Sequence, residues 1–357
     1  MAFINYRKET SERSDASNWA KQILIEQTGL YFDSIEGCNE NSQNLVTHMM
    51  ERARVDYTDE TPSDVNSVLE NIKTLETSDV LLRKINFATT FQRPLTYVLY
   101  CDEKEFVWMY TINSLGQCTL DRSFDSYQAF SNWIASVKGW KSTKPYRERQ
   151  DLPYFDKALR KAGTAWPTNI DCFVSNKEFQ PIGIIEFQNA KQTEVKRHNN
   201  NEFFHGKYAR QDQWGHVRYD NDVRRWQSQE ILRLQSGLRL FVITWAQNSN
   251  DYQLKEISVI TFSNLPNAKN WAMTNEYQRL MHELANNHSK ETVSKIAGQF
   301  SSYNLIYQEH DMDIVTHQPP LSVHEKTFPF IYYRYKNIVE GKRETLPNDF
   351  LELLSRI

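Results

Sequence analysis

The chain has 357 residues, a length that allows two or three domains with a well-buried core. Its formal net charge is −3, so any nucleic-acid partner would need a local basic surface. The four cysteines form no Cys-x-x-Cys pair, which argues against a zinc knuckle or disulfide framework and favours a reducing cytoplasm. No apolar run reaches the length of a membrane span, so we expect a soluble, cytoplasmic protein with no membrane partner.

Residues 1–145 are expected to form a separate N-terminal α/β module for recognition or assembly. Periodic apolar positions predict helices, and alternating or β-branched runs predict strands. The expected helices are 15–27, 44–54, 63–75 and 126–138, and the expected strands are 95–101, 105–112 and 117–120. The charged, proline-containing segment 141–151 is then a linker to the next domain.

The first residues of this module allow a different interpretation. The run Ala2-Phe-Ile-Asn-Tyr-Arg7, followed by a helix and Tyr31-Phe-Asp33, is similar to the opening of TIR domains. That resemblance implies an NAD-consuming defence effector. The next strands of such a domain are not evident, because residues 55–80 are polar and helix-like. A short strand packed on a helix is the simpler interpretation.

Residues 146–265 contain an ordered succession of elements. A helix is expected at 152–162 and strands at 169–174 and 181–188. A helix at 222–235, ended by a glycine, and a strand at 238–245 follow. The succession is therefore helix, strand, strand, helix, strand.

Each of the two central strands carries a carboxylate among apolar residues. Asp171 lies in the first strand, and Glu186 follows four residues with mainly apolar side chains in the second. Gln188 lies two positions beyond Glu186 and therefore shares its face of the strand. An isolated carboxylate is costly to bury unless a partner or metal offsets the charge. Asp171 and Glu186 on neighbouring strands would form an oxygen-rich site suited to Mg²⁺, although a structural role as a turn cap or ion pair remains open for Asp171.

These residues and this order resemble the PD-(D/E)XK nuclease superfamily, in its restriction-endonuclease branch. Asp171 and Glu186-Phe-Gln188 match its Asp and (Asp/Glu)-x-Lys signature, with Gln188 in place of the lysine. The resemblance implies one or two Mg²⁺ ions held by Asp171, Glu186 and the carbonyl of Phe187. Gln188 cannot act as a base, so its expected role is to orient water. Asp156 on the preceding helix is a possible outer-shell acid, or simply a solvated helix residue.

Residues 189–221 form a polar insertion between the second strand and the helix that follows. Lysine and arginine neutralise phosphates, whereas asparagine, glutamine and arginine can read base edges. Such a loop beside a metal site is expected to bind DNA; the alternative is a solvated excursion. The expected DNA contacts are Lys191, Lys196, Arg197, Asn199, Asn200, Asn201, Lys207, Arg210 and Arg218.

Residues 266–357 are expected to form a mainly helical extension that completes the core or mediates dimerisation. Helices are predicted at 271–286 and 289–300, and the aromatic run 328–335 favours core packing. No internal repeat is visible in the sequence.

The sequence therefore predicts a multi-domain α/β (α+β) protein with a central mixed β-sheet flanked by helices. The resemblance implies a Mg²⁺-dependent restriction endonuclease that cuts double-stranded DNA as a homodimer. A catalytically inactive nucleic-acid-binding or structural protein of the same fold is the alternative, beside the TIR-like effector.

Overall fold

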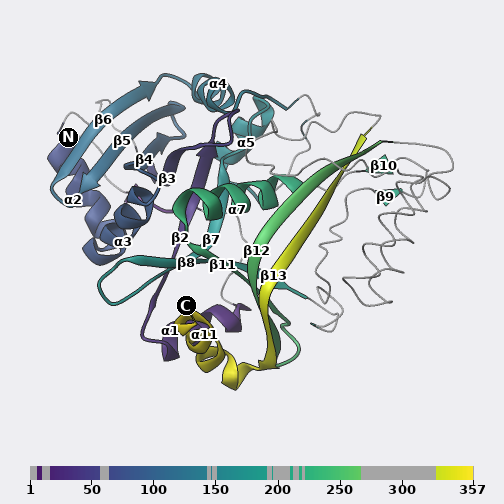
Figure 1. Cartoon of the computed structure of the whole chain (residues 1–357). Coiled ribbons are helices and arrows are strands. Elements are labelled where there is room, and N and C mark those ends of the chain that lie inside the picture. The colour runs from purple at the N-terminus through teal and green to yellow at the C-terminus, as the bar shows by residue number, and fades with distance from the viewer. Residues whose placement is uncertain are drawn as a thin grey trace.

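The computed structural model describes residues 6–9, 17–56, 64–142, 146, 151–190, 195, 210–211, 217–218, 222–266 and 327–356. Within these ranges the protein is an α+β fold built on one mixed sheet of 11 strands, with helices on both faces (Figure 1). The expected mixed sheet flanked by helices is thereby confirmed.

The large sheet has the strand order β13-β12-β11-β8-β7-β2-β3-β4-β5-β6, and β1 pairs with β3 beside this path. Because β2 pairs with β7 and β12 with β13, the sheet continues across the boundaries expected near residues 145 and 265. Its strands are β1 (Tyr6–Arg7), β2 (Tyr31–Glu40), β3 (Val46–Val55), β4 (Leu95–Cys101), β5 (Phe106–Ser114), β6 (Gln117–Phe124), β7 (Thr168–Ser175), β8 (Pro181–Asn189), β11 (Arg239–Trp245), β12 (Asp251–Pro266) and β13 (Thr327–Lys342).

Two groups of helices cover the two faces of this sheet. The helices are α1 (Trp19–Gln27), α2 (Val65–Glu76), α3 (Ser78–Thr89), α4 (Tyr127–Lys138), α5 (Tyr154–Lys161), α7 (Asp222–Ser236) and α11 (Leu346–Ser355), with a short 3-10 helix at Arg343–Thr345. Apolar residues of α2, α3 and α7 share one core cluster with the strands, on what we call the crossover face. Helices α1 and α11, and separately α4 and α5, pack on the opposite face.

The chain passes through the same succession of elements twice. The first half is α1-β2-β3-α2/α3-β4-β5-β6-α4, and the second half is α5-β7-β8-α7-β11-β12-β13-α11. In each half an antiparallel pair is followed by a helical crossover to a parallel strand, and two antiparallel strands complete the half. The structure thus contains a repeat that the sequence does not reveal.

The first helix of each half packs against the other half. In α1, Ile23 and Leu24 lie in the cluster formed with β7, β8 and β11, and Trp19 Nε1 donates to the carbonyl of Ala246 at 2.8 Å. In α5, Phe155 stacks on Tyr100 of β4 with ring centroids 4.2 Å apart. Figure 1 shows the two exchanged pairs, α1 beside α11 and α4 beside α5. The exchange ties the halves into one body.

One expected helix is wrong. Residues 44–54 were expected to be helical, and the methionine, glutamate, arginine and alanine residues among them do favour helices. They lie instead mainly in β3, a central strand whose residues Met49 and Met50 have no exposed surface. Burial on both faces of a sheet overrides this weak intrinsic preference.

The C-terminal extension is described only in part. Its described part consists of the long strand β13, the short 3-10 helix and α11. The aromatic run 328–335 lies within β13. The helices expected at 271–286 and 289–300 fall outside the described residues.

Candidate functional site

Both halves contain a point at which the two strands of the hairpin part. In the first half the last registered pair of β2 and β3 is Gly37 with Met50, and the next residues are Glu36 and Glu51. In the second half the last pair of β7 and β8 is Cys172 with Ile185, followed by Asp171 and Glu186. We call the pair Glu36/Glu51 the first fork and the pair Asp171/Glu186 the second fork. Each fork therefore carries two carboxylates.

The two hairpins correspond residue by residue. Asn39 pairs with His48 and Glu40 with Val46, with an irregularity between them. The second hairpin has the same irregularity at the same place, since Val174 pairs with Gly183 and Ser175 with Pro181. One constant sequence offset therefore relates both strands of the first hairpin to both strands of the second. Glu36 corresponds to Asp171, and Glu51 to Glu186.

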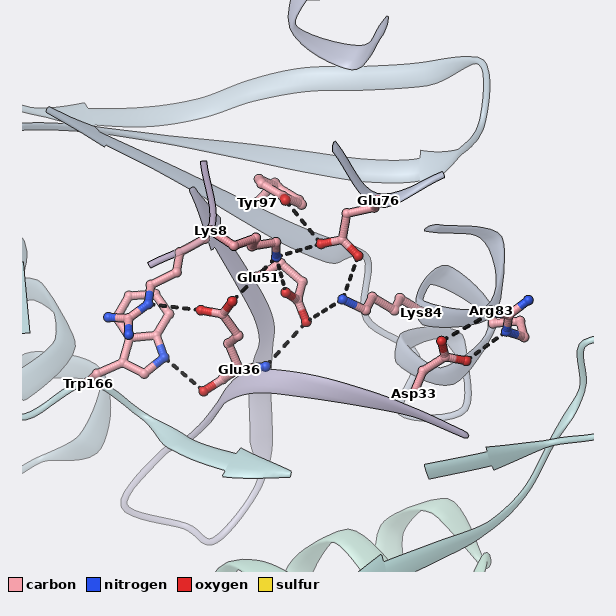
Figure 2. Close-up of polar contacts among 10 residues, drawn as sticks. Lys8, Asp33, Glu36, Glu51, Glu76, Arg83, Lys84, Tyr97 and Trp166 are labelled. Carbon is pink, nitrogen blue, oxygen red and sulfur yellow. Dashed lines mark hydrogen bonds and ion pairs between the residues drawn. The ribbon is translucent and has the colours of Figure 1, made fainter. Parts of the chain in front are cut away.

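The first fork holds a cation supplied by the chain. Strand β1 pairs with the end of β3 beyond the fork and delivers Lys8 between the carboxylates (Figure 2). Lys8 Nζ lies 2.5 Å from Glu51 Oε2, 2.5 Å from Glu76 Oε1 and 3.4 Å from Glu36 Oε1. Both acids of the fork thus share one positive charge with an acid from α2.

A second lysine balances the charge of this cluster. Lys84 Nζ, from α3, lies 3.1 Å from Glu51 Oε1 and 2.5 Å from Glu76 Oε2. The hydroxyl of Tyr97 donates to Glu76 Oε1 at 3.0 Å. The side chain of Glu51 has no exposed surface and that of Glu76 is 4% exposed. Two buried carboxylates therefore face two ammonium groups, the arrangement that buried ions require.

The pKa values of these groups follow from burial and from the shared lysines. Burial raises the pKa of Glu51 against the lowering effect of Lys8 and Lys84. Burial acts on Glu76 in the same sense, but Lys84 and Lys8 outweigh it and lower its pKa to about 2. Burial alone would lower the pKa of Lys8, yet Glu51 and its neighbours raise it well above its usual value. Lys8 is therefore a fixed cation at neutral pH.

Asp156 belongs to the first half of the sheet and not to the second fork. Its two oxygens accept from Arg52 Nη1 at 2.8 Å and Nη2 at 3.1 Å, while Arg52 Nε donates to Glu36 Oε2 at 2.9 Å. Arg52 also lies over the ring of Trp166 at 4.6 Å, on the face covered by α4 and α5. Glu186 points to the crossover face, so the structure does not place Asp156 beside it as an outer-shell acid.

Glu186 is the buried acid of the second fork. It is 3% exposed, and its Oε2 accepts from Gln229 Nε2 of α7 at 3.2 Å. The other amide atom, Gln229 Oε1, is buried without a hydrogen-bond partner. A buried amide oxygen of this kind is able to serve as an oxygen ligand beside a carboxylate. Lys255 of β12, also fully buried, lies two strands away at the same register position, with Val242 between them.

Asp171 lies at the second fork but is turned differently from Glu186. Ile170 and Phe173 both pack in the crossover-face cluster, whereas Cys172 packs on the opposite face. A bulge in β7 therefore directs Asp171 away from the crossover face, where its Oδ1 accepts from Asn169 Nδ2 at 3.0 Å. Asp171 and Glu186 thus lie on neighbouring strands, as expected, but their side chains do not point to the same face of the sheet.

The first fork shows how an acid at this bulge can still reach a cation. Glu36 occupies the position equivalent to Asp171, after a matching irregularity in β2. One of its oxygens contacts Lys8 on the crossover side, and the other accepts from Arg52 on the opposite side. The bulge position thus lies at the edge of the sheet opening and gives access to both faces.

The remaining predicted metal-site residues flank Glu186 along β8. Gln188 pairs in register with Thr244 of β11, and by strand alternation it shares the crossover face with Glu186. The hydroxyl of Thr244 is fully buried and has no hydrogen-bond partner. The side chain of Phe187 packs on the opposite face, in the cluster that contains α1 and α11. The hydroxyl of Thr244 and the Oε1 atom of Gln229 therefore lie on the side of β8 that faces α7.

The predicted DNA contacts are almost all outside the described residues. Arg210 and Arg218 are described only as backbone of a small hairpin, β9 (Arg210–Gln211) and β10 (Val217–Arg218). The other contacts expected in the insertion, from Lys191 to Lys207, lie outside the described residues.

Two kinds of feature are absent from the described part of the chain. No group of three or more histidine, cysteine or acidic side chains is arranged there to hold a metal ion. No described helix is long and apolar enough to cross a bilayer. A metal at the second fork would consequently need amide, carbonyl or water oxygens beside the two carboxylates.

Comparison with protein-family models, with curated proteins and with solved structures found no match.

Sequence reasoning missed the first fork. A signal was present, because Met49-Met50-Glu51 repeats the apolar-apolar-acid pattern of Ile184-Ile185-Glu186. The helix-favouring residues around Glu51 concealed it. Lys8 could not be associated with this site from sequence, since the acids that it contacts lie far along the chain.

Proposed function

We propose that this protein is a divalent-metal-dependent DNA endonuclease of the restriction-endonuclease type and that the second fork is its catalytic site. One observation carries the proposal: the second fork repeats the acid pair that holds a cation in the first fork. In the second fork the deeper acid, Glu186, has a neutral amide as its neighbour on α7. The two carboxylates of the second fork would offset the charge of a bound divalent ion.

The donor set at the second fork fits Mg²⁺, which prefers oxygen ligands and retains several waters. Glu186, with the Gln229 oxygen that has no partner, would hold the ion from the crossover side. Asp171 would hold it from the bulge, and the carbonyl of Phe187 is the further ligand that the resemblance implies. The few protein ligands suit an ion that also binds substrate phosphate.

The reaction is hydrolysis of a phosphodiester. Oxygen of a water molecule bonds to phosphorus and releases a proton to solvent. The bond from phosphorus to the 3′ oxygen breaks, the 3′ oxygen takes up a proton from solvent, and the products are a 5′-phosphate and a 3′-hydroxyl. A bound Mg²⁺ ion would lower the pKa of a coordinated water molecule and stabilise negative charge on the phosphate. Gln188 accepts a hydrogen bond from the attacking water and orients it, because an amide cannot remove the proton itself.

The test is incubation of purified protein with methylated and unmethylated plasmid, first with Mg²⁺ and then with EDTA. Cleavage is expected only with Mg²⁺. Glu186→Ala should abolish cleavage and retain DNA binding, whereas Glu178→Ala, an exposed acid in the turn of the same hairpin, should cleave normally. Equal cleavage by the Glu186→Ala and Glu178→Ala proteins would contradict the proposal. DNA binding without any cleavage by the unmodified protein would favour a non-catalytic nucleic-acid-binding protein.

A further inference from the structure

The two halves are related by an approximate two-fold axis through the centre of the sheet. Strands β2 and β7 are antiparallel neighbours, and Ile35 pairs with its own counterpart, Ile170. On either side of this pair the contacts mirror each other, since Asp33 pairs with Phe173 and Cys38 with Thr168. The axis therefore passes between Ile35 and Ile170, perpendicular to the sheet.

The exchanged helices obey the same symmetry. Helix α1 packs beside α11 under the second half, and α5 packs beside α4 under the first. Exchange of an equivalent element between two protomers is a feature of two-fold dimers. One chain here supplies both partners of such an arrangement.

The symmetry places both forks on one side of the molecule. Glu51 contacts Lys84 of α3, and Glu186 contacts Gln229 of α7, and both helices cover the crossover face. The two strands of duplex DNA are likewise antiparallel and related by two-fold axes. A protein of this shape with two working forks would present one fork to each DNA strand.

Two lysines of the chain neutralise the charge of the first fork. Lys8 and Lys84 lie within 3.1 Å of Glu51, and both are also bound to Glu76. A divalent ion entering this cluster would meet two ammonium groups at contact distance, in a buried setting where like-charge repulsion is strong. The first fork is thus closed to metal by cations that belong to the chain.

We infer that the chain is a single-chain counterpart of a two-fold dimer with one catalytic fork, and that it cuts one DNA strand in each binding event. This inference rests on the proposed function and specifies its product as nicked duplex. It also replaces the homodimer that the family resemblance implies, because the second protomer is already built into the chain.

The test is a time course of supercoiled plasmid cleavage at enzyme excess, with the mass of the protein–DNA complex measured by light scattering. Open circles are expected to accumulate almost completely before linear DNA forms, with one 42.2-kDa chain bound per duplex. Linear DNA as the first product, or two chains per duplex, would overturn the inference while the proposed function stands. Absence of any Mg²⁺-dependent cleavage would overturn both.

A charge-balanced variant tests the role of the first fork. The double substitution Glu51→Gln with Lys84→Met removes one acid and one of its two lysines, and its folding is verified by circular dichroism. Its nicking rate should stay within about twofold of the unmodified protein. Loss of nicking in the folded variant would show that the first fork takes part in the reaction and would refute the assignment. A variant that does not fold is replaced by Tyr97→Phe, which removes only the hydroxyl on Glu76 and should likewise leave nicking unchanged.

Discussion

Glu51 and Glu186 occupy equivalent positions in the two halves of one sheet, each on the second strand of a hairpin and one step beyond its last registered pair. Both are buried, and both contact a crossover helix. Their neighbours differ in charge. Glu51 is held by two lysines, whereas the described contact of Glu186 with α7 is to a neutral amide. Equivalent carboxylates are therefore contacted by different groups of their crossover helices, an ammonium group of α3 in the first half and an amide of α7 in the second.

Substitution of Gln188 should disturb the positioning of the attacking water without weakening the binding of DNA. Gln188→Leu removes the amide but keeps a similar volume, and misplacement of the attacking water should lower the cleavage rate roughly 100-fold. DNA affinity should change little. Single-turnover cleavage and filter binding measure the two quantities. Gln180→Leu, an exposed glutamine at the other end of the hairpin, is the matched control. Equal rates for the two variants would exclude a role for Gln188.

Removal of Lys84 should destabilise the protein strongly. Lys84→Met leaves Glu51 and Glu76 with one lysine between them, and breaking a buried ion pair from one side costs about 3–5 kcal/mol. Urea unfolding followed by circular dichroism measures the loss. Lys73→Met on α2 removes a lysine whose partner Glu70 is exposed, and it should cost less than about 1 kcal/mol. Comparable losses in both variants would mean that the cluster contributes no more than a surface pair.

The contribution of Glu76 should depend on pH in a defined direction. Burial opposes its ionisation, but Lys84 and Lys8 lower its pKa from 4.5 to about 2. A lowered pKa in the folded state stabilises the protein above the unfolded value of 4.5, and this stabilisation is lost as pH falls toward 2. The stability difference between the unmodified protein and Glu76→Gln should therefore be largest above pH 4.5 and shrink below it.

Glu70→Gln is the control variant, because Glu70 lies on the same helix with its side chain 69% exposed. Loss of its exposed pair with Lys73 should change stability by less than about 1 kcal/mol. Glu76 is one of the charges that raise the pKa of Glu51, so Glu76→Gln should also ease the ionisation of Glu51. A Glu76→Gln difference that grows on acidification would contradict the ion-pair assignment.

Arg52 should not be replaceable by lysine. Its guanidinium bonds both oxygens of Asp156, bonds Glu36 and lies over Trp166, a set of contacts that one ammonium group cannot reproduce. Loss of the charge-assisted hydrogen bonds should cost about 2 kcal/mol in Arg52→Lys. Arg122→Lys, at an exposed pair with Asp121, should change stability by less than about 0.5 kcal/mol. Chemical unfolding monitored by tryptophan fluorescence distinguishes the two.

Cutting the chain between the halves should not separate them. A protease site inserted between residues 142 and 151 divides the chain, but the pairing of β2 with β7 and the exchanged helices remain. The two fragments are expected to co-elute in size-exclusion chromatography. Trp19→Ala removes the α1 contact with Ala246 and Trp245, and should lower the temperature at which the cut protein dissociates. Separate elution of stable fragments without denaturant would contradict the two-half architecture.

The sequence predicted well those elements whose apolar pattern matches their burial. The helix at 152–162, the strands at 169–174 and 181–188, the helix at 222–235 and the strand at 238–245 appear as α5, β7, β8, α7 and β11, with ends within two residues of the prediction. The strand expected at 95–101 is β4 with the same bounds. Local periodicity was sufficient to predict these elements, because the burial of each one follows its own apolar pattern.

The remaining features depend on contacts between distant residues. The repeat was hidden because equivalent positions conserve only apolar character, as with Cys38 and Phe173 or Met49 and Ile184. The direction of Asp171 depends on a bulge that is set by pairing with β2, and no pattern within β7 indicates it. Prediction of the candidate site was accordingly right about which strands meet and incomplete about which way one side chain turns.

The exchanged helices have a consequence for biosynthesis. While the ribosome is still translating the second half, α1 lacks the strands that it will cover, and Met50, Val98 and Tyr100 lack α5. Until then, the apolar residues of the first half that these elements will cover remain exposed. Such exposure favours chaperone binding or association with neighbouring chains. Native packing becomes available only after the later strands have left the exit tunnel.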